Sequence, residues 1–294
     1  MQPAAQEAAR RRAALAFAAL FAGATAIGFS AIFVRHADVG PSAVGFWRMA
    51  LALPLILLWS WRDAAGRESA PPARPWGWAA AAGLAFAVDV FLFHVAVGLT
   101  TVAKASLLGN AAPLILAAVG IAFLGDRPGR AVIAALAMSC VGIILLVRPD
   151  DLAGGSLRGD MAGLGAAVSY AAYLVCIQRA RASSSSAWIS LTSTAICGAA
   201  CLAGAWAMGE SILPQSASGW LAVIALGVVS HALGQGLITV GLGGVAPSLA
   251  AVVLIYPAIL STALAAALFG EIPTALQLIG GGMILAALIL ARRG

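Results

Sequence analysis

Two segments of this chain follow one pattern and lie about half a chain apart. Residues 102–126 read VAKASLLGNAAPLILAAVGIAFLGD, and residues 245–271 read VAPSLAAVVLIYPAILSTALAAALFGE. Each passes through small residues to a proline, Pro113 or Pro257, crosses an apolar stretch and ends in a glycine followed by an acidic residue. Similarity at a fixed separation indicates an internally duplicated chain. If each unit crosses a membrane an odd number of times, the second copy is inverted, which is an architecture of secondary transporters.

The composition independently indicates a membrane protein. Hydrophobic residues make up 62% of the 294 positions and charged residues only 10%, whereas soluble domains carry roughly a quarter charged residues. The four cysteines all fall in apolar stretches, and no Cys/His spacing is typical of a metal site, so we expect neither disulfides nor a metal or other cofactor. The net charge of +6 comes from basic residues scattered between apolar stretches, which argues against a nucleic-acid partner.

Ten apolar stretches approach the roughly 20 residues needed to cross the hydrocarbon core. They cover residues 13–34, 42–60, 77–98, 102–124, 130–147, 159–178, 187–208, 217–240, 245–269 and 273–291. The first is too long for the apolar region of a typical signal peptide, so we interpret it as a span. We therefore expect an all-α membrane protein with ten transmembrane helices in two inverted five-helix repeats. A tail at 1–12 would precede repeats at 13–147 and 159–291.

The basic residues predict the orientation. If the N-terminus is cytoplasmic, the cytoplasmic segments carry Arg10, Arg11, Arg12, Arg62, Arg67, Arg74, Arg127, Arg130, Arg179, Arg181, Arg292 and Arg293. The opposite side carries only Arg35, Lys104, Arg148 and Arg158. Short cytoplasmic loops of membrane proteins are enriched in Lys and Arg. We therefore expect both termini to be cytoplasmic.

The two copies, the Phe46-Trp47-Arg48 sequence in the second span and Gly142 in the fifth resemble the EamA-type transporters of the drug/metabolite transporter superfamily. The resemblance covers essentially the whole chain. Within the superfamily the chain is most similar to bacterial aromatic amino acid exporters. It departs from the family in having Ile27-Gly28 where members often carry Trp-Gly.

This resemblance implies a secondary transporter of the bacterial inner membrane that exports amino acids, aromatic or neutral ones above all, or related small metabolites by alternating access. The expected partners are a small-molecule amino acid substrate and the lipid bilayer, and a monomer is compatible with the sequence. A multidrug or nucleotide-sugar carrier of the same superfamily is one alternative. An intramembrane enzyme is another, although Asp89 and His231 are the only pair from which a catalytic set could be built. Phosphate-binding loops and triad motifs are absent from the sequence, so we expect no catalytic residue.

Four polar residues within the spans are the main candidates for a substrate site. A charge near the bilayer centre costs at least about 2.5 kcal/mol on insertion scales, so such residues usually face protein or a wet cavity. Arg48 either pairs with Asp89 or binds a substrate carboxylate with its fork of donors. His231 lies near the middle of the eighth span, with Gln235 one turn further along. The sequence leaves open whether a protonation step at Asp89 or His231 is coupled to transport, and we favour facilitated transport.

Aromatic residues and prolines complete the predicted site. Tyr170 and Tyr173 of the sixth span could line a cavity for an apolar substrate. Pro113 and Pro257 each remove a helix hydrogen bond, and Asn110 and Tyr256 lie beside the two breaks. Because the prolines occupy matched positions in the two copies, we interpret them either as hinges for alternating access or as fixed kinks.

Overall fold

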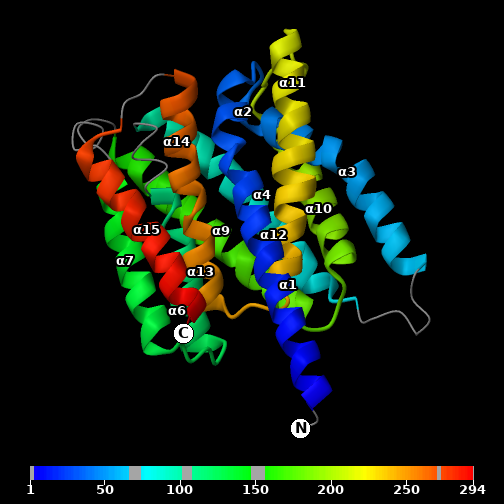
Figure 1. The fold of residues 1–294 in the computed structure, drawn as a ribbon. Helices are drawn as coiled ribbons and strands as arrows, with labels where there is room; N and C mark the ends of the chain where they lie inside the picture. The colour runs from blue at the N-terminus through cyan, green and yellow to red at the C-terminus, as the bar shows by residue number, and fades with distance from the viewer. Residues whose placement is uncertain (1–2, 66–73, 101–107, 147–155, 270–272, 294) are drawn as a thin grey trace.

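The computed structural model describes residues 3–65, 74–100, 108–146, 156–269 and 273–293, and every regular element in these ranges is a helix. The helices stand side by side as an elongated bundle, with both chain termini at the same end (Figure 1). Several residues named above lie outside the described residues: Arg67, Lys104, Arg148, Gly270 and Glu271.

The helices of the first half cover the first five predicted spans. They are α1 (Pro3–Gly28), α2 (Ser30–His36), α3 (Pro41–Ala65), α4 (Trp76–Leu99), α6 (Ala112–Phe123) and α7 (Arg130–Leu146). The first predicted span is divided between α1 and α2 by a turn at Phe29. Of the fourth span, residues 102–107 lie outside the described part of the chain.

The helices of the second half follow the remaining predicted spans. They are α9 (Leu157–Arg181), α10 (Ser186–Ala207), α11 (Ala217–Ala225), the π-helix η1 (Leu226–Gln235), α12 (Gly236–Gly241), α13 (Pro247–Ile255), α14 (Pro257–Phe269) and α15 (Ala275–Arg293). Three of these helices begin after a serine whose hydroxyl accepts a hydrogen bond from a backbone N–H in the first turn: Ser156, Ser185 and Ser216. Such caps satisfy donors that have no partner within the helix.

Eight of the helical stretches in the described chain are long and apolar enough to cross a membrane, judged by length and composition. Two shorter apolar helices, α6 and α7, occupy the fourth and fifth predicted positions. The chain is therefore a multi-pass, all-helical protein, while the count of ten complete crossings and the bounds of the two repeats stay predictions.

The packing partners repeat in a symmetrical order. The third predicted span, α4, packs against the sixth, α9, and the first, α1, packs against the eighth, formed by η1 and α12. Three further pairs join corresponding spans of the two halves: α3 with α10, α6 with α13, and α7 with α15. Exchanging the two halves reproduces this set of pairs, as expected for two similar units related by a two-fold axis.

Glycines allow the closest of these approaches. A Cβ atom placed on Gly142 of α7 would lie 2.8 Å from the carbonyl oxygen of Gly280 on α15, and one placed on Gly280 would lie 2.6 Å from the carbonyl oxygen of Gly142. No side chain fits at either position without moving the backbone of the partner helix. Small residues bring membrane helices together in this way because lipid provides no hydrophobic drive for their association.

The two matched prolines lie directly after breaks in their helices. Residues 110–111 form a turn before α6, which has Pro113 in its first turn, and Tyr256 forms the break between α13 and α14, which begins at Pro257. Pro257 has no N–H that could donate to the Val253 carbonyl oxygen. That oxygen accepts a hydrogen bond from the backbone N–H of Tyr256 at 3.1 Å instead. The freed acceptor is thus satisfied by a tighter local turn.

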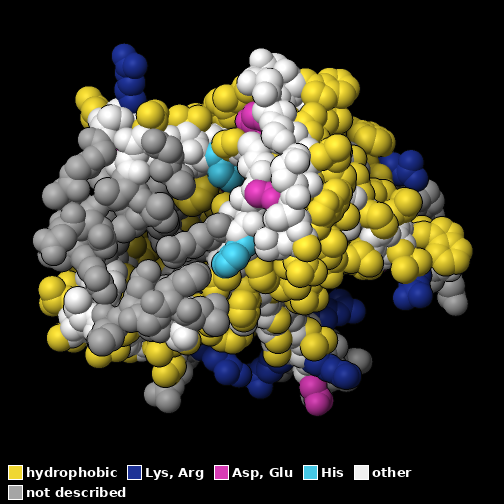
Figure 2. Space-filling view, turned by 90° about the horizontal axis from the view of Figure 1, so that it is seen from above, with side chains coloured by type: hydrophobic (Ala, Val, Ile, Leu, Met, Phe, Trp, Pro, Cys, Tyr) yellow, Lys and Arg dark blue, Asp and Glu magenta, His cyan; other side chains and the backbone are white. Residues whose placement is uncertain are grey.

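Two carboxylates connect α3 and α11 at the end of the bundle opposite the termini. Each belongs to a residue that precedes one of these helices, and each accepts hydrogen bonds at the start of the other helix. Asp38, which precedes α3, accepts hydrogen bonds from the backbone N–H groups of Gln215 and Ser216 before α11, at 3.2 and 2.8 Å. Glu210, which precedes α11, accepts from the Ala43 N–H and the Ser42 hydroxyl of α3, both at 2.9 Å. Acidic and histidine side chains lie toward the middle of this face, and Lys and Arg lie at its margin (Figure 2). The reciprocal contacts join the starts of α3 and α11.

At the other end of the bundle, Asp126 binds the start of α13. Its carboxylate accepts a hydrogen bond from the backbone N–H of Ser248 at 2.8 Å. Asp126 is the acidic residue that closes the first copy of the repeated pattern, so the first copy caps a helix of the second.

The contacts of Asp38 predict an acid-sensitive contribution to stability. Its pKa is lowered from 3.8, chiefly by the hydrogen bond from the Ser216 hydroxyl. A group whose pKa falls on folding stabilises the protein above its unfolded pKa, and this contribution is lost as the pH falls through the folded pKa. We expect Asp38→Ala to lower the melting temperature of the detergent-solubilised protein at pH 7, and the difference from wild type to shrink toward pH 3. Glu7→Ala, which removes an exposed acid at the opposite end, serves as the control; equal melting temperatures of Asp38→Ala and wild type at pH 7 would contradict the assignment.

Candidate functional site

Arg48 lies inside the bundle on α3, about seven residues or roughly 10 Å from the start of the helix at the usual rise per residue. Its guanidinium carbon is 5.4 Å from the centroid of the Phe86 ring on α4. Its Nε atom is buried and has no hydrogen-bond partner. The structure therefore holds a cation against an aromatic face with donor capacity unused.

The residue before Arg48 fixes the position of this part of α3. The indole N–H of Trp47 donates a hydrogen bond to the carbonyl oxygen of Ile212 at 2.6 Å, and its ring meets that of Trp220 edge-on at 4.9 Å. With the Asp38 and Glu210 contacts nearby, this anchors α3 to the start of α11. The position of Arg48 is thus fixed by contacts at the start of its helix.

Three aromatic rings form a cluster beside Arg48. Phe86 stacks with Tyr173 of α9 at a centroid separation of 4.7 Å and lies 6.1 Å from Tyr170 of the same helix. Tyr170 and Tyr173 are themselves stacked at 5.7 Å. Phe86 therefore connects the predicted aromatic pair to Arg48, because it contacts both tyrosines and the guanidinium.

His231 also stacks against the Phe86 ring. The two rings are nearly parallel with centroids 5.8 Å apart. Its Nε2 atom and the Thr194 hydroxyl of α10 are 2.8 Å apart, a hydrogen bond whose direction depends on the histidine tautomer. Its Nδ1 atom is buried without a partner. The histidine is therefore held by a side chain of α10, with one ring nitrogen unused.

Gln235 connects the tyrosines to the same π-helix. Its side-chain nitrogen donates to the Tyr170 hydroxyl at 3.5 Å, and its carbonyl oxygen in the side chain is buried without a partner. Both His231 and Gln235 lie on η1, where the helix is wider than an α-helix. π-Helical segments are rare and occur frequently at functional sites.

Asp89 lies one turn beyond Phe86 on α4 and shares its environment with Arg48. Arg48 and Asp89 are close enough for the charge of each to influence the other. No salt bridge joins Arg48 and Asp89, although both belong to the described part of the chain. Among the described residues the guanidinium of Arg48 therefore has no direct ionic partner.

The remaining predicted residues make other contacts. Tyr256, in the break of the ninth span, packs its ring against Phe21 of α1 at 4.8 Å. Asn110 lies in the turn before α6, where the described residues give its side chain no hydrogen bond. Pro113 and Pro257 occupy the first turns after the two breaks. No hydrogen bond or cation–π contact among the described residues joins these four to Arg48.

The sequence analysis did not identify Phe86 or Thr194 as members of the cluster, nor the π-helix that carries His231 and Gln235. Phe86 was open to identification, since it precedes Asp89 by three residues and therefore shares its helix face. Thr194 gives no signal, because a threonine in an apolar helix usually bonds its own backbone. The π-helix was likewise unforeseen, since the eighth span has the composition of an ordinary apolar helix.

The cluster combines one fixed cation, an aromatic surface and three polar atoms that lack partners. Buried polar atoms are nearly always hydrogen-bonded in folded proteins, so several unpartnered ones gathered together indicate a place where a polar ligand binds. Among the described residues there is no group of three His, Cys, Asp or Glu side chains that could hold a metal ion. The arrangement suits recognition of a small molecule that has both an anionic and an apolar part.

Comparison with known proteins decides the family. The model of the EamA-like transporter family matches residues 14–148 and again residues 157–293. The chain belongs to the EamA-like transporter family. This membership supports a membrane transporter rather than an enzyme, as the sequence predicts.

Two further similarities agree with the EamA-like assignment. An uncharacterized transporter of Archaeoglobus fulgidus is 29% identical over 281 residues, which cover 94% of this chain and 96% of that protein. A solved crystal structure with 21% sequence identity matches the fold with a TM-score of 0.78 over 95% of this chain and 98% of its own. At that sequence identity the structural match supports the fold alone.

The Thr194–His231 contact yields a test of how this site is held. Thr194→Val keeps the side-chain shape but removes the hydroxyl, so both ring nitrogens of a buried histidine would lack partners. We expect the free energy of unfolding to fall by about 1–3 kcal/mol, the usual cost of an unsatisfied buried polar group. Thr194→Ser retains the hydroxyl and should cost less. Denaturant unfolding in detergent micelles measures both variants, and equal stability of Thr194→Val and wild type would show that the contact is unimportant.

Proposed function

We propose that this EamA-like transporter exports amino acids, preferentially neutral ones with aromatic or large apolar side chains. The observation that carries the proposal is Arg48, a half-buried residue whose Nε donor is buried and unused. It lies beside an aromatic cluster and forms no salt bridge with Asp89. A planar guanidinium matches a carboxylate better than any other side chain does, because two of its N–H groups can donate in parallel.

The polar atoms of the second half suit the other charged group of an amino acid. The unpartnered side-chain oxygen of Gln235 can accept a hydrogen bond from an ammonium group, as can the unpartnered nitrogen of His231 in the appropriate tautomer. A zwitterion would thus find a donor on the first half and acceptors on the second.

The apolar part of such a substrate has a matching surface. Phe86, Tyr170 and Tyr173 form a stacked group next to Arg48. An aromatic ring packed against such a group gains about 0.5–1.5 kcal/mol beyond the burial of its area. No second cation of the described chain contacts the three rings, which favours a neutral side chain over an acidic one.

Alternating access requires two places where helices can bend, and the breaks at Asn110–Ala111 and at Tyr256 are our candidates. They occupy matched positions in the two copies of the pattern, and the prolines that follow prevent continuous helix bonding across them. The Phe21–Tyr256 ring contact would hold the second hinge against α1 in the conformation described.

We infer the orientation from the distribution of arginine. Arg10–Arg12, Arg62, Arg179 and Arg292 lie at the helix ends on the side of both termini. This side would be the cytoplasmic side of a bacterial inner membrane. Transport from this side to the other is export.

The proposal is tested by counterflow of labelled phenylalanine in proteoliposomes. Arg48→Ala removes a charged hydrogen-bond donor worth about 1.5–3 kcal/mol, so we expect the transport efficiency to fall about 10- to 100-fold. Arg48→Lys keeps the charge but not the paired donors, and we expect an intermediate value.

Arg62→Ala, which removes an exposed arginine at the end of the same helix, is the matched control and should transport normally. Size-exclusion profiles show whether each variant is folded. A folded Arg48→Ala variant with wild-type counterflow would refute the role of Arg48, and absence of amino acid counterflow in the wild type would refute the substrate class.

A further inference from the structure

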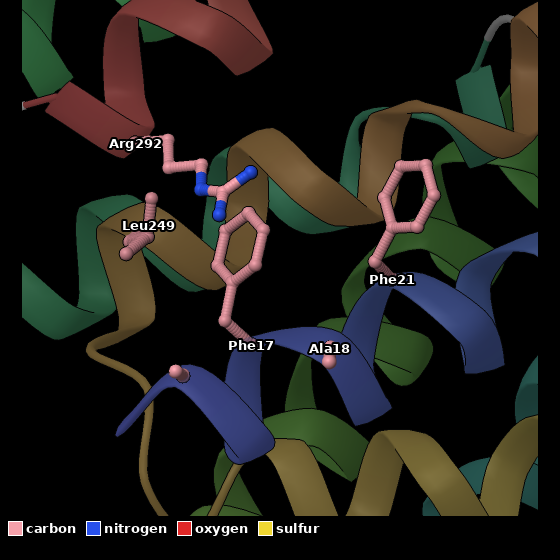
Figure 3. A pocket seen from close by; sticks show the side chains of 6 residues that line it. Phe17, Ala18, Phe21, Leu249 and Arg292 are labelled. Carbon is pink, nitrogen blue, oxygen red and sulfur yellow. The ribbon is translucent and has the colours of Figure 1, made fainter. Parts of the chain in front are cut away.

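A groove between the first and last helices lies apart from the central cluster. It has a volume of about 380 Å³. The residues that line it come from α1, α13 and α15: Ala14, Phe17, Ala18, Phe21, Leu249 and Arg292 (Figure 3). Ala14 and Ala18 are exposed, so the groove opens to the surface of the bundle.

The walls of the groove are apolar. Phe17 and Phe21 project from one side and Leu249 from the other, and all three are half-buried (Figure 3). The two alanines on α1 have no side chain long enough to close the opening. An apolar lining of this kind suits hydrocarbon chains.

Arg292 places a cation at the lip of this groove. It lies in the last turn of α15, and its side chain extends over the groove toward Phe17, with the guanidinium carbon 5.8 Å from the ring centroid (Figure 3). The residue is exposed, and no carboxylate of the described chain pairs with it. Its charge is available to a ligand that enters from the membrane.

Two further arginines extend the cationic lip. The groove residues of α1 recur at spacings of three and four and therefore share one helix face. Arg10 and Arg11 precede Ala14 by four and three residues, so they continue this face for one more turn toward the N-terminus, and both are exposed. Glu7, one turn further, is the acidic residue on the same face. The end of the groove thus carries an excess of positive charge.

We propose that this groove binds one anionic phospholipid of the leaflet on the side of both termini. Its acyl chains lie against Phe17, Phe21 and Leu249, and its phosphate is bound by Arg292 together with Arg10 and Arg11. Arginine binds phosphate oxygens through paired donors, and basic pockets between helices at the membrane surface select anionic headgroups. A zwitterionic lipid would bring its own cation toward the same arginines.

The lipid would connect the two halves of the transporter. α1 belongs to the first matched segment, and α13 and α15 belong to the second. A lipid held by Phe17 on one side and by Leu249 and Arg292 on the other therefore bridges helices that are far apart in sequence. This inference does not depend on the transported substrate.

Native mass spectrometry of the delipidated full-length protein, titrated with phosphatidylglycerol or phosphatidylcholine, tests the proposal. We expect wild type to bind one phosphatidylglycerol more tightly than phosphatidylcholine. Arg292→Gln should weaken phosphatidylglycerol binding about fivefold, which corresponds to about 1 kcal/mol per arginine near a membrane surface. Its affinity for phosphatidylcholine should not change. Arg62→Gln, on an exposed helix end elsewhere, should leave both affinities as in wild type.

A second variant tests the groove itself. Ala18→Trp fills the opening from α1 and should abolish the tight phosphatidylglycerol site while the protein stays monodisperse. Equal affinity of wild type and Arg292→Gln for phosphatidylglycerol, or equal binding of the two lipids by wild type, would overturn the proposal. It would also be overturned if Ala18→Trp left phosphatidylglycerol binding unchanged, because the lipid would then bind elsewhere.

Discussion

The cation of Arg48 sets the main constraint on this structure, because a guanidinium inside an apolar bundle must be surrounded by protein or by a wet site. The bundle meets this constraint without a salt bridge. Phe86 presents its ring face at 5.4 Å from the guanidinium carbon, and Tyr170 and Tyr173 stack beside that ring. A salt bridge would have occupied donors of the guanidinium. This arrangement leaves its donor free for a ligand.

The helices around Arg48 are fixed at their ends and irregular near the site. Two reciprocal carboxylate caps, from Asp38 and Glu210, fix the outer ends of α3 and α11, and the π-helix that follows α11 turns His231 and Gln235 toward the aromatic cluster. Farther from Arg48, glycine contacts such as Gly142–Gly280 bring whole helices into direct backbone contact. Rigid helix ends and crossings thus support a centre that is polar and locally irregular.

Much of this architecture follows from sequence, because apolar length, glycine spacing and helix-breaking residues act locally. The helix positions, the breaks beside Pro113 and Pro257 and the inward location of Arg48 and His231 were accessible in this way. The Arg48–Asp89 salt bridge that the sequence allows does not form, since its geometry depends on how α3 and α4 cross. The role of Thr194 and the π-helix were inaccessible for the same reason: both depend on contacts between helices that no local pattern encodes. The roles of the site residues in transport stay predictions.

The central claim is that Arg48 recognises a carboxylate, and competition between close analogues tests it most directly. Counterflow of labelled phenylalanine in proteoliposomes would be measured with unlabelled phenylalanine, its methyl ester or phenethylamine as competitor. All three carry the same ring and amino group, but only the free amino acid has a carboxylate. The account predicts competition by phenylalanine and at least tenfold weaker competition by the other two, because they forgo a charged hydrogen bond worth about 1.5–3 kcal/mol. Equal competition by all three compounds would contradict it.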